Sequence, residues 1–287
     1  MPKRILILGA HGMLGHIALK YFSTQKLFKV FGTYRRSIPL FSKRLNLSSA
    51  PLYQWDALKN LSSIKKNIFK LKPNVIINCI ADLECQDENF KKAFLLNSYL
   101  PQYISHICHK MSILFIHIST DGVFSGQKGN YNTDDTPDAF DNYGLTKISG
   151  EQIRSGIIIR ASIIGRNIMK QHGILDWMIN GKEKKASGYV DYIFNGITTL
   201  ELVKSIEKIL KKNKNPKNKK IYHIGSSAIT KHNLLRIINK VYNLRKDITS
   251  KRAGKINRSL STNNFFSPKK NIEQQLIEYK KFSNIIY

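Results

Sequence analysis

Short apolar runs separated by longer amphipathic stretches mark the first half of the chain. The runs predict buried strands at residues 4–8, 29–34, 75–79, 113–118 and 156–160. The stretches between and after them predict helices near residues 13–22, 58–71, 87–97, 101–111 and 142–154. Strands of four to six residues that alternate with helices are typical of an α/β protein with a doubly wound parallel sheet.

After residue 161 the alternation becomes irregular. Helices are expected near 173–180, 199–212 and 231–244, with strands near 189–194 and 221–224, before a polar C-terminal segment. We therefore expect a sheet domain over residues 1–161. Residues 162–287 should form mainly a smaller C-terminal substrate-binding lobe, with segments near 189–212 and 221–224 returning to the sheet domain.

The chain is strongly basic, since its 287 residues include 47 Lys and Arg against 19 Asp and Glu, a formal net charge of +28. Such a surface attracts anions of every kind. The surplus is mostly lysine spread along the chain, without a nucleic-acid recognition motif, so no specific nucleic-acid partner is expected. The apolar runs are far shorter than the ~18 residues of a membrane span. We expect a cytoplasmic protein without membrane insertion.

The three cysteines Cys79, Cys85 and Cys108 form no CxxC motif and are odd in number. Neither a disulfide framework nor a structural zinc site is indicated. His106 and His109 lie near Cys108, but this spacing scatters the three side chains around a helix. No metal site is therefore expected.

A glycine triplet, Gly9, Gly12 and Gly15, stands between the first predicted strand and the first predicted helix. Glycines at this place let the backbone turn tightly and approach a pyrophosphate, and the helix N-terminus offers N–H groups to the anion. The position of the triplet directly after a strand makes it more specific than the glycines alone. It predicts a Rossmann-type dinucleotide-binding domain.

The end of the second strand indicates which dinucleotide is bound. A site for NAD usually has an acidic residue here, which holds the adenosine ribose hydroxyls. The chain instead reads Thr33, Tyr34, Arg35 and Arg36. Two guanidinium groups suit a 2′-phosphate, which they can bind bidentately. We therefore expect NADPH as the cofactor, with NADH left open.

Tyr143 and Lys147 are four residues apart and lie on one face of a predicted helix. A nearby ammonium stabilises a phenolate and so lowers the pKa of the phenol. The spacing alone is weak evidence, since Tyr242 and Lys246 share it. The first pair is distinguished by Thr120, which follows a strand at the edge where such sheets bind ligands. These three residues are the predicted catalytic set.

The chain resembles the extended short-chain dehydrogenases/reductases, and within them the dTDP-4-dehydrorhamnose reductases. The matching segments run in order from near the start to about residue 265. They are residues 7–16, 75–79, 97–101, 119–126, 143–147, 159–162, 197–202 and 258–260. The most specific is the Ser-Thr-Asp-Gly-Val-Phe-Ser-Gly segment at 119–126, because it separates this branch from most short-chain enzymes.

The resemblance implies roles for individual residues. Thr120, Tyr143 and Lys147 match the catalytic set, and Thr120, Asp121 and Tyr143 are expected to contact substrate. The residues expected to contact the cofactor are Gly9, His11, Gly12, Met13, Leu14, Asp56, Ala57, Cys79, Ile80, Ala81 and Asn97, besides Gly15, Arg35, Arg36, Tyr143 and Lys147. Four of these residues have an alternative, purely structural explanation. Met13 and Leu14 could belong to the core, Asp56 could cap a helix, and Asn97 could be a buried amide with all its hydrogen bonds made within the protein.

Two positions depart from the family pattern. Gly122 stands where the reductases often have tyrosine, and Ile163 where they have a tryptophan that contacts the sugar. Dehydratases of the superfamily have a glutamate base at the position of Gly122, so dehydration is disfavoured. The identity of the sugar stays open. In the basic lobe, Arg258 is the candidate to bind the nucleotide diphosphate of the substrate.

The resulting hypothesis is an NADPH-dependent reductase of a nucleotide-linked 4-keto-6-deoxy sugar, serving surface polysaccharide or O-antigen synthesis. In this mechanism Tyr143 protonates the keto oxygen, and Lys147 holds the ribose hydroxyls and lowers the pKa of the phenol. Two alternatives remain: a nucleotide-sugar epimerase of the same superfamily, and a non-catalytic NADP-binding regulatory subunit. The nucleotide and the oligomeric state are open, with a homodimer among the alternatives.

Overall fold

The computed structural model describes residues 1–35, 50–168, 173–212 and 218–284. Within these residues, seven parallel strands form one sheet in the order β11-β6-β5-β4-β1-β2-β3. The strands are β1 (Lys3–Leu8), β2 (Phe28–Tyr34), β3 (Leu52–Gln54), β4 (Val75–Asn78), β5 (Leu114–Ser119), β6 (Gly156–Arg160) and β11 (Lys219–His223). The order reverses direction between β1 and β4, which confirms the doubly wound sheet.

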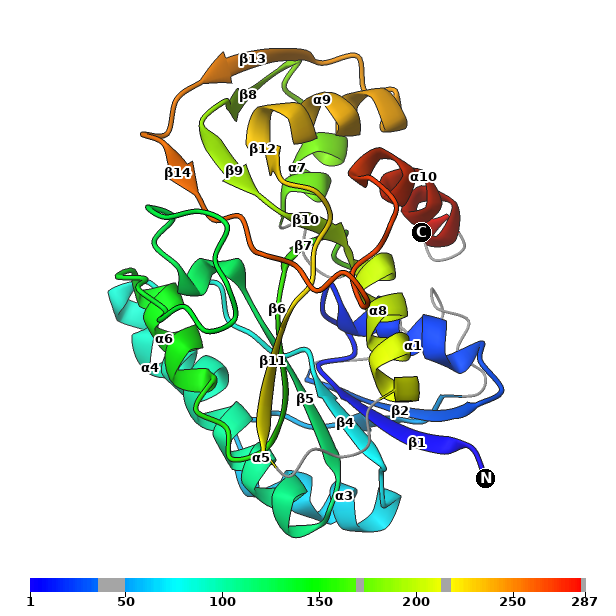
Figure 1. The fold of residues 1–287 in the computed structure, drawn as a ribbon. Helices are drawn as coiled ribbons and strands as arrows, with labels where there is room; N and C mark the ends of the chain where they lie inside the picture. The colour runs from blue at the N-terminus through cyan, green and yellow to red at the C-terminus, as the bar shows by residue number, and fades with distance from the viewer. Residues whose placement is uncertain (36–49, 169–172, 213–217, 285–287) are drawn as a thin grey trace.

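Helices cover both faces of the sheet (Figure 1). One face carries α1 (Gly15–Ser23) and α8 (Thr199–Lys212). The other carries α3 (Ile64–Leu71), α5 (Leu100–Lys110) and α6 (Asn142–Gly150). Short elements pack against these helices or against one another: η1 (Leu61–Ser63), η2 (Asp87–Asn89), α4 (Phe90–Phe94), the π-helix η3 (Leu95–Tyr99) and η4 (Asp121–Val123). Successive strand residues point to opposite faces. Ile5 and Ile7 therefore join the core under α1, while Leu6 and Leu8 join the core under α3 and α5.

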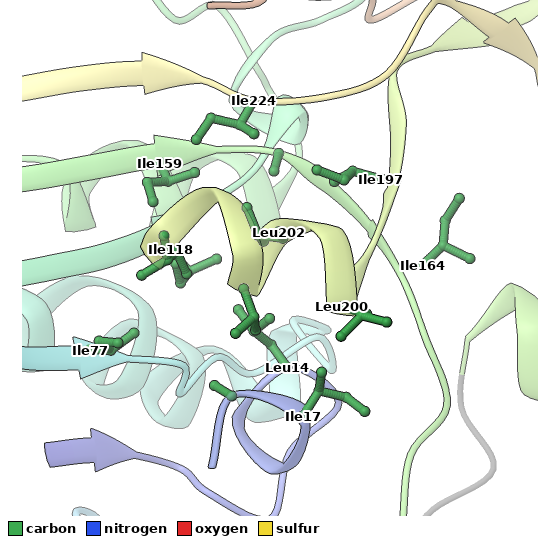
Figure 2. Close-up of a cluster of buried hydrophobic side chains, with 14 of the residues drawn as sticks. Leu14, Ile17, Ile77, Ile118, Ile159, Ile164, Ile197, Leu200, Leu202 and Ile224 are labelled. Carbon is green, nitrogen blue, oxygen red and sulfur yellow. The ribbon is translucent and has the colours of Figure 1, made fainter. Parts of the chain in front are cut away.

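The core on the α1 face holds in place the ends of several elements that carry candidate site residues. Figure 2 shows Leu14 and Ile17 near α1 and Leu200 and Leu202 of α8 among the apolar side chains of the sheet. The sheet contributes residues from neighbouring strands, which are Ile77, Ile118 and Ile159. Because these side chains are almost fully buried, the turn after β1 is held firmly against the sheet.

The remaining elements form a lobe above the sheet, on the side where β6 leads into it (Figure 1). They are β7 (Ser162–Ile164), α7 (Ile174–Asn180), β8 (Lys185–Tyr189), β9 (Tyr192–Phe194), β10 (Gly196–Thr198), β12 (Ile229–Thr230), α9 (Lys231–Tyr242), β13 (Asp247–Lys251), β14 (Ile256–Asn257) and α10 (Ile272–Ser283). The lobe strands make three small sheets, β7 with β10, β8 with β13, and β9 between β12 and β14.

Several elements differ from the sequence expectation. The single strand expected at 189–194 is divided, because β8 ends at Tyr189 and β9 starts at Tyr192. Both pair with lobe strands, so within 189–212 it is α8 that packs on the sheet domain, against α1. The C-terminal segment expected to be polar contains α10, whose buried side chains recur at helical spacing, at positions 272, 275, 276, 279 and 283. Among the described residues, no helix is long and apolar enough to cross a membrane.

Candidate active site

The glycine-rich turn after β1 leaves room at its centre. Gly9 has φ +76°, a conformation that other residues rarely adopt. An added Cβ on Gly15 would overlap the backbone of Gly9 and Ala10, whereas one on Gly12 would find its nearest neighbour, the Gly9 carbonyl oxygen, at 3.4 Å. Leu14, the N-cap residue of α1, makes no side-chain capping hydrogen bond. Free room beside a helix start without a side-chain cap fits a pyrophosphate.

This difference between two glycines is testable. Gly12→Ala should leave the free energy of unfolding within about 1 kcal/mol of wild type but weaken NADPH binding at least tenfold, because the methyl group takes the space of the phosphates. Gly15→Ala should lower the free energy of unfolding by about 1–3 kcal/mol, because the backbone must shift. Urea unfolding and fluorescence titration with NADPH measure both. Wild-type affinity for NADPH in a stably folded Gly12→Ala variant would contradict a pyrophosphate site at this turn.

The end of β2 holds the glycine turn in place. The Gly9 N–H donates to the Thr33 hydroxyl at 3.1 Å, and the Ala10 N–H donates to the Thr33 carbonyl at 2.8 Å. Arg35 follows directly and is half-buried. Arg36, the second expected phosphate ligand, lies outside the described residues. The end of β2, which is expected to contact the adenosine ribose, is thus hydrogen-bonded to the glycine turn, which is expected to bind the pyrophosphate.

Two of the expected cofactor contacts have side chains packed into the protein. Leu14 is buried in the core beside α8. Met13 lies against Gly165 and Gly173, where an added Cβ would meet its side chain. His11 is half-buried in the turn. The buried Leu14 side chain is thus core, whereas the half-buried Met13 side chain still borders the turn.

Residues after β4 line the same edge of the sheet. Cys79 is half-buried, and burial raises the pKa of its thiol to about 12, so the side chain is an uncharged thiol. The Ile80 side chain lies over Gly9, and Ala81 is exposed. Ala57, from the turn after β3, is buried. This edge offers a mainly apolar surface beside the glycine turn.

Asp56 and Asn97 have partners within the protein. The Asp56 carboxylate accepts the N–H of Leu58 at 3.0 Å, which closes a local turn. The Asn97 amide, inside the π-helix η3, donates to the Asp82 carbonyl at 2.9 Å and to the Thr146 hydroxyl at 3.1 Å. Its oxygen accepts the Asp82 N–H at 2.8 Å. Asn97 thus ties the loop after β4 to α6, and its amide is satisfied without a ligand.

Thr120, Tyr143 and Lys147 meet at the carboxyl end of β5. The Thr120 hydroxyl accepts the N–H of Gly122 at 3.0 Å and is hydrogen-bonded to Tyr143. Lys147 is 1% exposed, and its ammonium donates to the Ile118 carbonyl at 2.9 Å. The first turn of α6 brings the tyrosine to the loop, and the next turn brings the lysine to the strand. The structure therefore brings the three predicted residues together.

Burial controls the protonation of this group. It raises the pKa of the Tyr143 phenol well above its ordinary value, assisted by Asp121, and the hydrogen bond with Thr120 only partly opposes it. Burial also lowers the pKa of Lys147 to about 8, while the negative charge of Glu151 acts in the opposite direction. The pKa of the Tyr143 phenol is thus shifted upward, whereas the sequence predicts that Lys147 lowers it. The reason is that the cost of burying a phenolate outweighs the favourable contacts.

The low pKa of Lys147 has a measurable consequence for stability. The unfolded chain, with an ordinary lysine pKa near 10.5, binds more protons than the folded chain between pH 8 and 10.5. Wild-type stability should therefore rise with pH in this window relative to Lys147→Met. The difference between their free energies of unfolding should change by roughly 2 kcal/mol between pH 7 and 10. Lys220→Met, at an exposed position of β11, is the control, and equal pH profiles for all three proteins would contradict a buried ammonium.

A buried ion pair anchors the end of α6. Arg160, at the end of β6, donates from Nη2 to Glu151 Oε2 at 2.6 Å and from Nε to Glu151 Oε1 at 3.0 Å, and both side chains are at most 3% exposed. Ser119 donates to Glu151 Oε1 at 2.6 Å. His223 of β11 accepts from Arg160 and donates to the Tyr131 carbonyl, an arrangement that needs a neutral ring. Burial lowers the pKa of His223 to about 4, consistent with that state.

The lobe brings Arg258 to the N-terminus of α6. Its Nη2 lies 3.6 Å from the carboxylate of Asp141, the residue that caps α6. Arg258 is also hydrogen-bonded to Tyr192 of β9. Asp121 is buried, which raises the pKa of its carboxyl group, and the charges of Lys231 and Arg258 oppose this shift. Arg258 and Asp121, both expected to contact substrate, therefore share one charged region with Lys231.

A family model described as the RmlD substrate binding domain matches residues 3–263. The chain belongs to this family. The match spans both the sheet domain and most of the lobe, so the membership covers all the site residues described above. The sequence resemblance to dTDP-4-dehydrorhamnose reductases is confirmed at the level of the family.

Two curated relatives match about half of this RmlD-family chain. A probable low-salt glycan biosynthesis reductase, Agl14 of Haloferax volcanii, is 30% identical over 148 residues, 50% of this chain and 46% of that protein. The β subunit of methionine adenosyltransferase 2 from Xenopus tropicalis is 32% identical over 155 residues, 52% of this chain and 42% of that protein. The chain thus matches less than half the length of either relative.

The fold is shared with solved structures over nearly its whole length. The dTDP-4-dehydrorhamnose reductase of Bacillus anthracis, solved in complex with NADP, superimposes with a TM-score of 0.76, covering 98% of this chain and 100% of that chain at 19% sequence identity. At this identity the likeness shows the fold of the RmlD-family chain and carries no information about its substrate.

Sequence reasoning missed Glu151 and Lys231. Glu151 lies four residues after Lys147, so helical spacing could have placed its carboxylate on the same side of α6. Lys231 could not be found in this way, since it approaches Asp121 only through the pairing of β12 with β9. The departure at Gly122 has a local reason as well. An added Cβ there would lie 3.3 Å from the Thr120 hydroxyl and from the Tyr143 ring.

Proposed function

We propose that this RmlD-family chain is an NADPH-dependent reductase of a nucleotide-linked 4-keto-6-deoxy sugar, acting in polysaccharide synthesis. The observation that carries the proposal is the meeting of Thr120, Tyr143 and Lys147 at the end of β5. This end lies on the same edge of the sheet as the glycine turn after β1. The name of the Haloferax volcanii relative, a probable glycan biosynthesis reductase, supports the reaction class.

The cofactor assignment rests on the glycine turn and on β2. The room at Gly12 and the uncapped start of α1 suit a pyrophosphate. Arg35, with no carboxylate at the end of β2, favours the 2′-phosphate of NADPH over the free hydroxyl of NADH. The NADP complex of the Bacillus anthracis structure supports the same class of cofactor. When bound, the nicotinamide supplies a hydride.

The side chains of the catalytic group would polarise and protonate a carbonyl. The Thr120 and Tyr143 hydroxyls would donate hydrogen bonds to the keto oxygen of the sugar. Burial raises the pKa of Tyr143, so the phenol stays protonated at neutral pH. It can then deliver its proton as negative charge develops on the keto oxygen, as a general acid. Lys147 would hold ribose hydroxyls of the cofactor and stabilise the phenolate that forms.

An assay with a substrate panel tests this function. The purified chain is incubated with NADPH or NADH and with 4-keto-6-deoxy sugars linked to dTDP, UDP or GDP, and cofactor absorbance is followed. We expect oxidation with at least one sugar, faster with NADPH than with NADH. A folded chain that oxidises neither cofactor with any member of the panel contradicts the proposal.

A dinucleotide-binding subunit is the second candidate. The observation that favours it is the relative from Xenopus tropicalis, which is named as a subunit of another enzyme. Tight NADPH binding without turnover on the full panel would favour this role. The complete catalytic group argues for the enzyme, because a subunit without a reaction has no need for a buried ammonium beside a phenol.

A further inference from the structure

A buried polar pair joins β4 and β5 near the ends that carry site residues. Asn78 is the last residue of β4, and His117 lies directly opposite it on β5, shortly before Thr120. Both side chains are fully buried, and the Asn78 amide nitrogen lies 3.1 Å from Nδ1 of His117. The pair thus connects the strand that leads to the glycine turn's neighbouring loop with the strand that leads to the catalytic group.

The hydrogen bonds of Asn78 fix the protonation of the His117 ring. The backbone N–H of Ile80 donates to Asn78 Oδ1 at 3.2 Å, so the amide atom that faces His117 is Nδ2. An amide N–H donates, and Nδ1 of His117 must therefore accept. A protonated ring has a donor at each nitrogen and would place two donors face to face. His117 is therefore neutral, with its proton on Nε2.

This neutral ring is unfavourable for the stability of the fold. Its Nε2 is buried without a hydrogen-bond partner among the described residues, and a buried unpaired donor costs more than an apolar group of similar shape. Burial and the positive charge of Lys147 hold the pKa of His117 well below its ordinary value, so the ring forms no ion pair either. An apolar side chain would avoid this cost. Packing alone therefore does not account for His117.

The hydrogen bond that His117 accepts reaches the glycine turn through one intermediate residue. It holds the Asn78 amide in the orientation in which Oδ1 receives the N–H of Ile80. The Ile80 side chain in turn lies over Gly9, where an added Cβ would be 2.8 Å from it. A rotated Asn78 amide would bring its NH2 group to the Ile80 N–H, so that two donors would face each other. The acceptor on His117 therefore determines which amide atom faces the loop after β4.

We propose that His117 is a positioning residue of the cofactor site, whose Nδ1 orients Asn78 and thereby holds the loop at residues 79–81 against the glycine turn. This inference rests on the proposed function for the identity of the cofactor. The role requires a hydrogen-bond acceptor at the place of Nδ1. Asparagine can present its Oδ1 near that place, whereas leucine fills the space without an acceptor.

Two substitutions separate the acceptor from the volume of the ring. His117→Leu should weaken NADPH binding roughly three- to tenfold and speed alkylation of Cys79, the half-buried thiol of the same loop, by a similar factor. His117→Asn should keep both values near wild type, although its smaller side chain leaves a cavity and lowers the melting temperature more than leucine does. Fluorescence titration measures binding, and mass spectrometry of iodoacetamide-treated protein measures alkylation without cofactor.

The outcomes separate this role from the proposed function. A folded His117→Leu variant that matches the wild type in either value overturns the positioning role, and so do equal losses in His117→Leu and His117→Asn, which indicate lost packing. Ser105→Ala is the control, because it removes a buried hydrogen bond to the Ser155 carbonyl from α5 and should change neither value. If the wild type binds no NADPH, the proposed function fails, and the alkylation rates alone decide the role of His117.

A measurement on the wild type decides the matter even if His117→Leu does not fold. Heteronuclear NMR of the labelled full chain shows which imidazole nitrogen carries the proton. Between about pH 5 and 8, His117 should keep its proton on Nε2 and an unprotonated Nδ1. A proton on Nδ1, or a ring that titrates within this range, overturns the positioning role.

Discussion

Replacing Tyr143 with phenylalanine should lower kcat on the keto sugar by about 10²–10⁴-fold. The substitution removes the hydroxyl that we propose as the general acid, and the expected loss falls in the range that such groups contribute. The aromatic ring remains, so NADPH binding and the melting temperature should stay close to wild type. Steady-state kinetics and NADPH titration on the same preparation measure both effects.

Tyr242→Phe is the control for this prediction. Tyr242 has a lysine four residues later, as Tyr143 does, but it lies at the end of α9 in the lobe. Its hydroxyl is buried with no hydrogen-bond partner among the described residues, so its removal should leave kcat unchanged. Equal kcat values for the two variants would contradict the assignment of Tyr143 as the proton donor.

Removing the carboxylate of Glu151 should have the largest effect on stability. Glu151→Ala leaves the buried guanidinium of Arg160 without its partner. Breaking a buried pair from one side costs about 3–5 kcal/mol, a large part of the 5–15 kcal/mol typical of a folded domain. Urea unfolding monitored by circular dichroism gives the free energy.

Two further variants check the cause of this loss. Asp135→Ala breaks the surface pair with Lys128 and should lower the free energy of unfolding far less than Glu151→Ala does, because exposed ion pairs contribute little. The double variant Glu151→Leu, Arg160→Met removes both buried charges and should recover most of the loss, because an apolar pair can replace a buried ion pair at little cost. A double variant as unstable as Glu151→Ala would show that packing, rather than an unpaired charge, explains the effect.

The central sheet and the meeting of Thr120, Tyr143 and Lys147 at the end of β5 could be predicted because both depend on local patterns. An apolar run that ends at a glycine or a hydroxyl residue marks the carboxyl end of a strand, and all such ends in a parallel sheet lie on one edge. Gly9 and Thr120 follow β1 and β5 in this way, and Tyr143 and Lys147 follow from helical spacing. These predictions required no knowledge of contacts between residues far apart in the sequence.

The rest depends on contacts between residues far apart in the sequence. The network of Arg160 needs His223, which reaches it because β11 pairs with β6. Lys231 reaches Asp121 through the lobe strands, which are two to five residues long and carry little periodic signal. The direction of the pKa shift of Tyr143 could not be predicted from the sequence either, since the degree of burial is a property of the folded chain.

The most direct test of the central claim is the transfer of deuterium from stereospecifically labelled NADPH to the keto sugar, read by NMR and mass spectrometry of the product. A reductase that uses Tyr143 to protonate the keto oxygen must place the label on the former carbonyl carbon. We therefore expect one deuterium at C4 of the sugar in each product molecule. Label at any other carbon, or a product without label, would contradict the reductase.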